Sequence, residues 1–241
     1  MNKTKIEWTE TTWNPITGCT KHSAGCLNCY AERMAKRLQA MGAEAYQNGF
    51  MPTFHEHLLE RPLSWKKSRM IFVNSMSDTF HEDIADEQIL QLFAVMNRAR
   101  WHTFQVLTKR SDRLLKLSPH IEWTPNIWQG VTVENAAARS RIEDLRNTGA
   151  MTKFLSIEPL IGRIAGLNLS GLDWVIVGGE SGPGARRMEE EWVTSIRDIC
   201  IERRTPFFFK QWGGVRKKQN GRKLENRIWN EMPLVEDLRT L

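Results

Sequence analysis

Short apolar runs alternate with longer segments that are apolar on one side only, starting near residue 70. Residues 70–73 are Met-Ile-Phe-Val, without a polar side chain. Segment 86–100 then places apolar residues at three- and four-residue steps, which indicates an amphipathic helix. The same order recurs through most of the chain and is typical of parallel strands covered by helices. We expect strands at 70–73, 103–107, 127–131, 153–157, 173–177 and 206–209, and helices at 86–100, 111–116, 136–147 and 190–203.

Small polar or charged residues follow each of these apolar runs. Asn74 follows the first run, Glu134 the third and Lys210 the last. The carboxyl ends of parallel strands lie at one edge of a sheet, where α/β enzymes bind their substrates. A shorter alternating run at 6–9 could be the first strand or a brace at that edge. The sequence therefore predicts an α/β fold, an incomplete, open β/α barrel of about six or seven parallel strands.

Three of the four cysteines lie close together, just before a predicted helix at 31–41. Cys19, Cys26 and Cys29 are separated by six residues and then by two. Glycines within this segment let the backbone turn tightly. A helix start favours thiolates and anionic ligands. We call residues 18–29 the cysteine loop, and we expect it to hold a metal ion or a cluster.

Length and charge indicate one domain. The chain has 241 residues and a net charge of +6, and no linker-like block interrupts it. We expect a single domain over 1–241, with an irregular insertion at about 42–68 and a basic tail at about 215–241. The polar N-terminus and the lack of a long apolar run predict a cytoplasmic protein without a membrane span. In such a reducing compartment, clustered thiols favour metal binding over disulfides.

Three close thiolates suit either zinc or an iron–sulfur cluster. Structural zinc takes four protein ligands, so a fourth would have to be His22, His55 or Cys200. Cys200 lies in an apolar helical stripe, which is typical of a buried thiol. A 4Fe–4S cluster held by three cysteines instead keeps one iron without a protein ligand, and that iron can bind a small molecule.

Three segments of the chain, taken together, resemble a widespread family of phage-type three-cysteine proteins of the radical S-adenosylmethionine (SAM) class. They are WNPITGCTKHSAGCLNCYAERMAKR, VGGESGPGAR and PFFFKQWGG, and they extend from residue 13 to residue 214. The first gap between cysteines is longer here than the three-residue gap commonest in that class. The resemblance implies a partial β/α barrel, a 4Fe–4S cluster on Cys19, Cys26 and Cys29, and SAM as cosubstrate. It also implies an electron donor such as a flavodoxin or ferredoxin, and it supplies no substrate.

Positions at the strand ends suggest roles around such a cofactor. We expect one group to contact polar groups of SAM, a second to approach its methionine or ribose portion, and a third to act on the substrate. These groups are, in order, Asn74, Ser156 and Glu158; Gly178, Gly179 and Glu180; and Lys109, Glu134 and Lys210.

Three functions stay open at this point. The first is a radical-SAM enzyme acting on a nucleic acid or nucleotide, which the basic balance favours. The second is a radical-SAM enzyme with a peptide or small-metabolite substrate. The third is a zinc-binding, non-enzymatic module that interacts with nucleic acid or protein. Four tryptophans near the predicted rim could stack on a planar ligand or pack in the core, namely Trp8, Trp13, Trp174 and Trp212.

Overall fold

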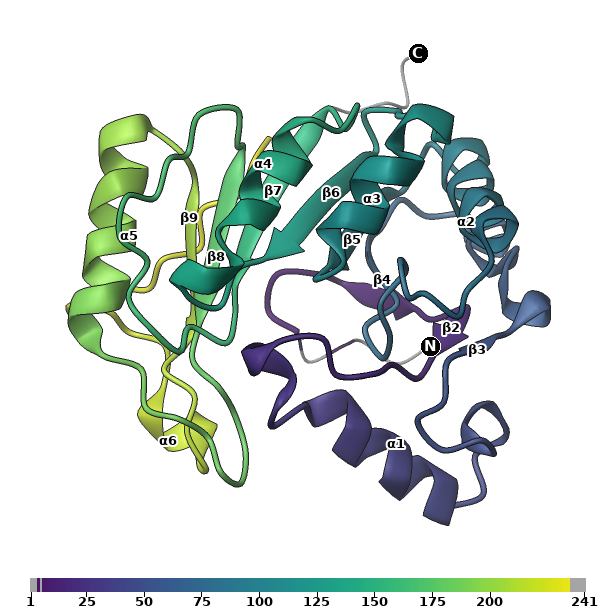
Figure 1. Cartoon of the computed structure of the whole chain (residues 1–241), viewed down its shortest axis with the longest axis horizontal. Coiled ribbons are helices and arrows are strands. Elements are labelled where there is room, and N and C mark those ends of the chain that lie inside the picture. Colours follow the sequence, from purple (N-terminus) through teal and green to yellow (C-terminus); the bar gives the residue numbers. More distant parts are fainter. Residues whose placement is uncertain (1–3, 5, 235–241) are drawn as a thin grey trace.

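The computed structural model describes residues 4 and 6–234, without the side chains of residues 217 and 218. Seven strands form one parallel sheet that curls into a half-barrel, in the order β1-β4-β5-β6-β7-β8-β9 (Figure 1). The predicted open β/α barrel is therefore confirmed. The strands are β1 (Thr11–Trp13), β4 (Met70–Val73), β5 (Thr103–Thr108), β6 (Ile127–Thr132), β7 (Thr152–Ile157), β8 (Trp174–Gly178) and β9 (Phe207–Gln211).

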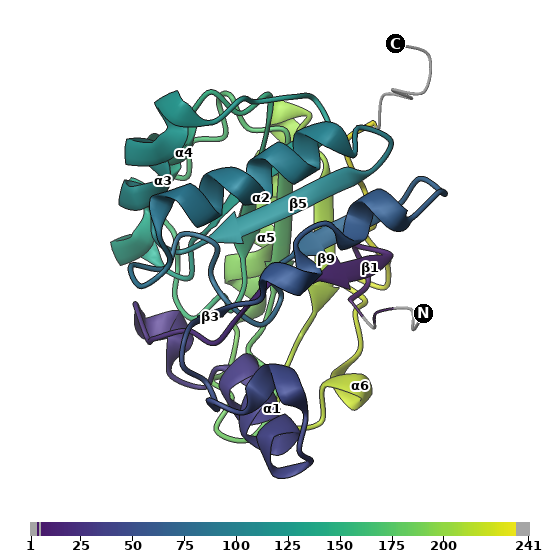
Figure 2. The same cartoon turned by 90° about the vertical axis from the view of Figure 1, so that its right-hand side faces the viewer.

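The outer side of the sheet is covered by α2 (Asp86–Arg98), α3 (Ser111–Leu117), α4 (Ser140–Arg146) and α5 (Glu190–Arg203), whereas α1 (Tyr30–Ala40) lies apart from them in both views (Figures 1 and 2). The main core lies between the sheet and these covering helices, where Phe93 of α2 and Val106 of β5 are fully buried. The predicted helix at 136–147 is in fact a 3₁₀ turn, η6 (Ala136–Ala138), followed by a short α4. A further short helix is α6 (Lys217–Asn220).

An aromatic cluster fills the inner side of the half-barrel. The Trp174 ring lies 6.1 Å from that of Trp8, 5.7 Å from that of Phe154 and 6.1 Å from that of Phe208, centroid to centroid. Run 6–9 is thus not a strand, because Trp8 inserts into this cluster and the first strand begins at Thr11. Trp8 and Trp174 are buried here, and Trp13 is buried in the outer core, so none of the three rings is open to a ligand. Ring packing of this kind closes the lower part of the barrel.

The segment at 42–68 packs against the start of the chain. Its strand β3 (Thr53–Phe54) pairs antiparallel with β2 (Ile16–Thr17), directly before the cysteine loop. It also contains the short 3₁₀ helices η2 (Glu44–Tyr46), η3 (Glu56–Leu58) and η4 (Arg61–Ser64). The insertion therefore supports the cysteine loop from the side.

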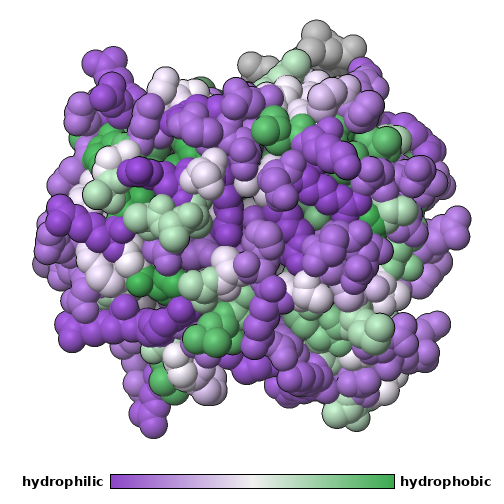
Figure 3. Space-filling model, viewed as in Figure 1, coloured by the Kyte–Doolittle hydropathy of each residue, from purple (hydrophilic) through white to green (hydrophobic). Residues whose placement is uncertain are grey.

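The surface seen in Figure 3 is largely hydrophilic, with small scattered hydrophobic patches. Within residues 4 and 6–234, no helix is both long enough and apolar enough to cross a membrane.

The absence of a side chain at Gly130 makes room for the aromatic cluster. A Cβ atom at Gly130 would lie 2.5 Å from ring atoms of Phe154 on the neighbouring strand. We predict that Gly130→Ala lowers the free energy of unfolding in urea by about 1–3 kcal/mol, because the added methyl group displaces the ring. The double variant Gly130→Ala/Phe154→Leu should lose less free energy of unfolding than the two single variants lose in sum. Strict additivity would contradict this packing.

Candidate functional site

The cysteine loop connects β2 to α1 along the chain, and it crosses the carboxyl edge of the half-barrel. Its first residue, Gly18, bridges to Ser77 in the segment after β4, and Cys29 is the N-cap of α1. Gly18 has φ of +80°, and a Cβ atom there would lie 2.1 Å from the carbonyl oxygen of Met51. Only glycine fits this close approach. The three thiols are therefore placed above the strand ends, as the sequence predicts.

Cys19 is held from two sides. Its backbone N–H donates to the carbonyl oxygen of Phe50 at 3.0 Å, and its Sγ accepts from Nη1 of Arg110 at 3.8 Å. Burial and the Asp78 carboxylate raise the pKa of the Cys19 thiol to about 12, while Arg110 acts in the opposite direction. Negative charge on the other two cysteines also raises this pKa, so the three thiols lie within electrostatic reach of one another.

Glu134, after β6, anchors the middle of the cysteine loop. The carboxylate is 1% exposed and accepts hydrogen bonds from the Ser23 hydroxyl and, at 3.3 Å, from the Gly25 N–H. Its other oxygen accepts from Nη1 of Arg141 at 2.8 Å. Although desolvation acts against it, the bond from Ser23 and the charge of Arg141 hold the pKa of Glu134 below its ordinary value. Both oxygens are thus engaged within the protein.

Glu180, after β8, anchors the end of the loop in the same way. Its Oε2 accepts from the Asn28 amide at 3.0 Å and from Nε of Arg186 at 2.9 Å. Arg186 also donates to the carbonyl oxygen of Ala24 at 3.0 Å. Desolvation would raise the pKa of Glu180, but the bonds from Arg186 and Asn28 lower it below its ordinary value.

Asp78, after β4, acts on the start of the loop through Arg110. Its carboxylate accepts from the Thr108 hydroxyl at 2.6 Å and lies 3.6 Å from Nη1 of Arg110. Arg110 in turn donates to the Thr20 hydroxyl at 2.8 Å and to Glu82 at 2.6 Å. Carboxylates at the ends of three alternate strands therefore fix the start, middle and end of the cysteine loop.

A second polar group lies at the ends of β7, β8 and β9. Lys210 Nζ lies 2.8 Å from both carboxylate oxygens of Glu158, and Gln211 donates to the same carboxylate at 3.3 Å. A Cβ atom at Gly178 would lie 3.2 Å from the Glu158 carboxyl carbon, so glycine there makes room for the acid. Desolvation of its hydroxyl raises the pKa of the Tyr30 phenol, and the charges of Cys29 and Glu158 raise this pKa further. The Tyr30 ring is exposed, while its hydroxyl donates to the Ser75 carbonyl beside the cysteine loop.

The other predicted site residues have varied surroundings. The Asn74 amide is engaged within the protein: its Oδ1 accepts from the Ile16 N–H at 3.0 Å and its Nδ2 donates to the Thr79 hydroxyl at 2.9 Å. Gly179 allows two chain segments to touch, because a Cβ atom there would lie 2.0 Å from the carbonyl oxygen of Trp212. Those two residues therefore have packing roles that the sequence did not indicate.

Ser156 and Lys109 lie nearer the inner side of the half-barrel than Asn74 and Gly179 do. Ser156 is buried on β7, and its register with Ile176 places it on the face that carries the aromatic cluster. The ammonium group of Lys109 makes no hydrogen bond or ion pair with the described residues, although its charge lowers the pKa of Glu134. Lys109 is therefore available to a ligand.

The donor chemistry of the loop fits an iron–sulfur cluster. Three half-buried thiols from one loop are the ligand set of a cluster with one open iron. In the described part of the chain, no group of three or more His, Cys, Asp or Glu side chains is arranged so that it could hold a metal ion. Two proposed fourth zinc ligands are engaged elsewhere. His55 Nε2 pairs with the Thr17 hydroxyl at 2.8 Å, and Cys200 is fully buried in the main core.

The described part of the basic tail packs on the sheet. The Arg222 guanidinium lies 5.0 Å from the centre of the Phe208 ring, and that of Arg227 lies 3.9 Å from the centre of the Trp229 ring. Both cations therefore serve internal contacts. The side chains at 217 and 218 and residues 235–241 fall outside the described residues.

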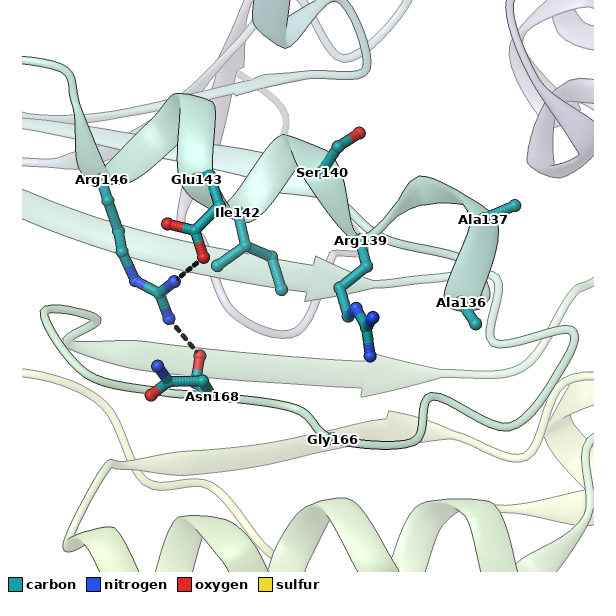
Figure 4. Close-up of a pocket in the computed structure, with 9 residues that line it drawn as sticks. All are labelled: Ala136, Ala137, Arg139, Ser140, Ile142, Glu143, Arg146, Gly166 and Asn168. Carbon is teal, nitrogen blue, oxygen red and sulfur yellow. Dashed lines mark hydrogen bonds and ion pairs between the residues drawn. The ribbon is translucent and has the colours of Figure 1, made fainter.

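A separate pocket of about 600 Å³ opens on the outer surface beside α4 (Figure 4). Arg139 and Arg146 donate to the backbone carbonyls of Ala165 and Asn168, and so pin the segment after β7 to the helix. Its lining includes no cysteine and no predicted site residue, so the pocket is distinct from the cysteine loop.

Sequence reasoning missed the partners of the strand-end acids. Arg110, Arg141 and Arg186 each pair with an acid at a strand end, and Ser23 and Asn28 complete the anchors from the loop. A signal was available for two of them, since Arg141 and Arg186 follow Glu134 and Glu180 by seven and six residues.

A family model described as "Protein of unknown function (DUF5131)" matches residues 3–233. No curated protein and no solved structure matches the chain.

The Glu134 anchor predicts a large effect of its removal. Glu134→Ala should lower the free energy of unfolding by about 3–5 kcal/mol, because it leaves the buried Arg141 cation without its partner. It should also increase hydrogen exchange of the cysteine loop. Glu143→Ala, on α4, is the matched control, because its exposed ion pair with Arg146 should contribute no more than about 1 kcal/mol. Equal effects of the two variants would contradict the anchor.

Acid should weaken the same anchors. The folded-state pKa values of Glu134 and Glu180 are depressed, so their stabilisation is complete above the unfolded-state pKa. It is lost as the pH falls through the folded values. Between about pH 7 and pH 3, the free energy of unfolding should fall less steeply in Glu134→Gln/Glu180→Gln than in the unsubstituted protein. Parallel pH profiles would count against this assignment.

Proposed function

This chain belongs to the DUF5131 family, whose description assigns no activity, and from the geometry of its site we propose that it is a radical-SAM enzyme. Cys19, Cys26 and Cys29 would hold a 4Fe–4S cluster, with SAM as cosubstrate. When bound and reduced, such a cluster supplies the single electron that cleaves SAM into methionine and a 5′-deoxyadenosyl radical, which abstracts hydrogen from a substrate.

One observation carries this proposal. The loop that carries the three thiols is tied to the carboxyl edge of an open parallel barrel by acids that follow β4, β6 and β8, the first of them acting through Arg110. A binding module needs no such rim, whereas an enzyme binds its substrate there. Anchoring the ligands in advance lowers the cost of ordering them when the cofactor binds.

The strand-end residues divide into two proposed groups. Glu158, Lys210 and Ser156 lie toward the inner space and would contact SAM or substrate, together with Lys109, whose ammonium group has no partner among the described residues. The carboxylate oxygens of Glu134 and Glu180 bind the cysteine loop and the arginines Arg141 and Arg186. We therefore assign these two acids to positioning the cysteines.

We further propose a nucleic acid or nucleotide as substrate, on the net charge of +6. Flavodoxin or ferredoxin would supply the electron, and the protein would work in the cytoplasm. A peptide or small metabolite is the competing substrate class, and it predicts no salt-dependent binding to polyanions.

Iron–sulfur reconstitution under anaerobic conditions tests the proposal. We expect about four iron atoms per chain and a brown visible spectrum, both absent from a Cys19→Ala/Cys26→Ala/Cys29→Ala variant. Adding dithionite and SAM to the reconstituted protein should release 5′-deoxyadenosine.

Cys200→Ala is the matched control, since that thiol lies in the core and should leave the iron content unchanged. If the native protein contains one zinc and no iron, and gains no iron on reconstitution, the proposal of a radical-SAM enzyme is rejected. That result would leave a zinc-binding interaction module in its place.

A further inference from the structure

Arg110 directs its guanidinium group at the first cysteine. Nη1 donates to Cys19 Sγ at 3.8 Å, and the Arg110 side chain is only 6% exposed. Other nitrogens of the same group bind Glu82 at 2.6 Å and the Thr20 hydroxyl at 2.8 Å. The guanidinium is therefore a buried donor held in a fixed orientation toward sulfur.

We infer that Arg110 sets the reduction potential of the cluster proposed above, by donating an N–H···S hydrogen bond to the Cys19 ligand. This inference rests on the proposed function. Hydrogen bonds to ligand sulfur and nearby positive charge stabilise the reduced, more negative state of an iron–sulfur cluster. Arg110 therefore makes the cluster easier to reduce.

The surroundings of Arg110 explain why an arginine occupies this place. Asp78, 3.6 Å from Nη1, and Glu82 neutralise much of its charge, so burial of the guanidinium is tolerated. Asp78 is fixed in turn by the Thr108 hydroxyl and the Lys109 N–H. A lysine could not reach the sulfur, Thr20 and both acids at once, because it lacks the planar fork.

Redox titration of the reconstituted protein tests the inference, with the cluster followed by its visible and electron paramagnetic resonance spectra. Arg110→Met should disfavour the reduced cluster at least tenfold, which is a midpoint potential lower by about 59 mV for one electron. Arg110→Lys keeps the charge beside Asp78 and Glu82 and should give a smaller shift in the same direction. Arg110→Lys also provides the test if Arg110→Met fails to fold.

Arg197→Met is the matched control. Arg197 is likewise a buried arginine shared by two acids, Asp198 and Glu225, but it lies on α5 and contacts no residue of the cysteine loop. It should lower stability without moving the potential. An Arg110 that merely tethers the loop would reduce iron content or stability and leave the potential of the assembled clusters unchanged.

The outcomes separate this inference from the proposed function. If the unsubstituted protein binds a cluster and both Arg110 variants titrate at its potential, the inference is overturned and the proposed function stands. If the unsubstituted protein binds no cluster, both fall together.

Discussion

The position of the cysteine loop depends on the buried carboxylates at the strand ends, because these acids need hydrogen-bond donors. An ionised acid as buried as Glu134 is costly unless donors surround it. Arg141 supplies one donor from the barrel side, and Ser23 and Gly25 supply the others from the loop. The acid can therefore be satisfied only when the loop is in place. The same constraint at Glu180 makes the position of the loop a condition of folding.

The inner aromatic cluster limits how deep the space between the cluster and the strand ends can be. Trp174 and its neighbouring rings fill the lower part of the half-barrel, and Gly130 lets the Phe154 ring approach the backbone of β6. Ser156, Lys210 and Glu158 bring polar groups to the strand ends above this layer, while Gln105 lies among the rings and donates to the Trp8 carbonyl. The ligands proposed above would therefore bind at the rim, beside the cysteine loop. Closing the bottom with apolar rings also keeps the strand-end charges in one layer.

Much of the fold follows from the sequence, because a parallel strand buried on both sides leaves a continuous apolar run. Strands 70–73 and 127–131 are predicted nearly to the residue. Of the two roles left open for run 6–9, a first strand or a brace, the strand is excluded: the alternation fits a strand, but Trp8 packs inside the barrel and the first strand begins at Thr11. The location of the three thiols could also be predicted. The contact of Arg110 with Cys19 could not, because the two residues meet only through the closure of the sheet.

The six-residue gap between Cys19 and Cys26 has a structural explanation in these anchors. Within it, the Thr20 hydroxyl accepts from Arg110, and the Thr20 backbone N–H donates to Nε2 of His81 at 3.1 Å. Further along the gap, Ser23 and Gly25 bind Glu134. A gap of three residues would hold fewer of these contacts. The longer spacing thus lets one loop use two strand-end anchors before the second cysteine, and the CxxC pair then follows at the start of α1, where Asn28 meets Glu180.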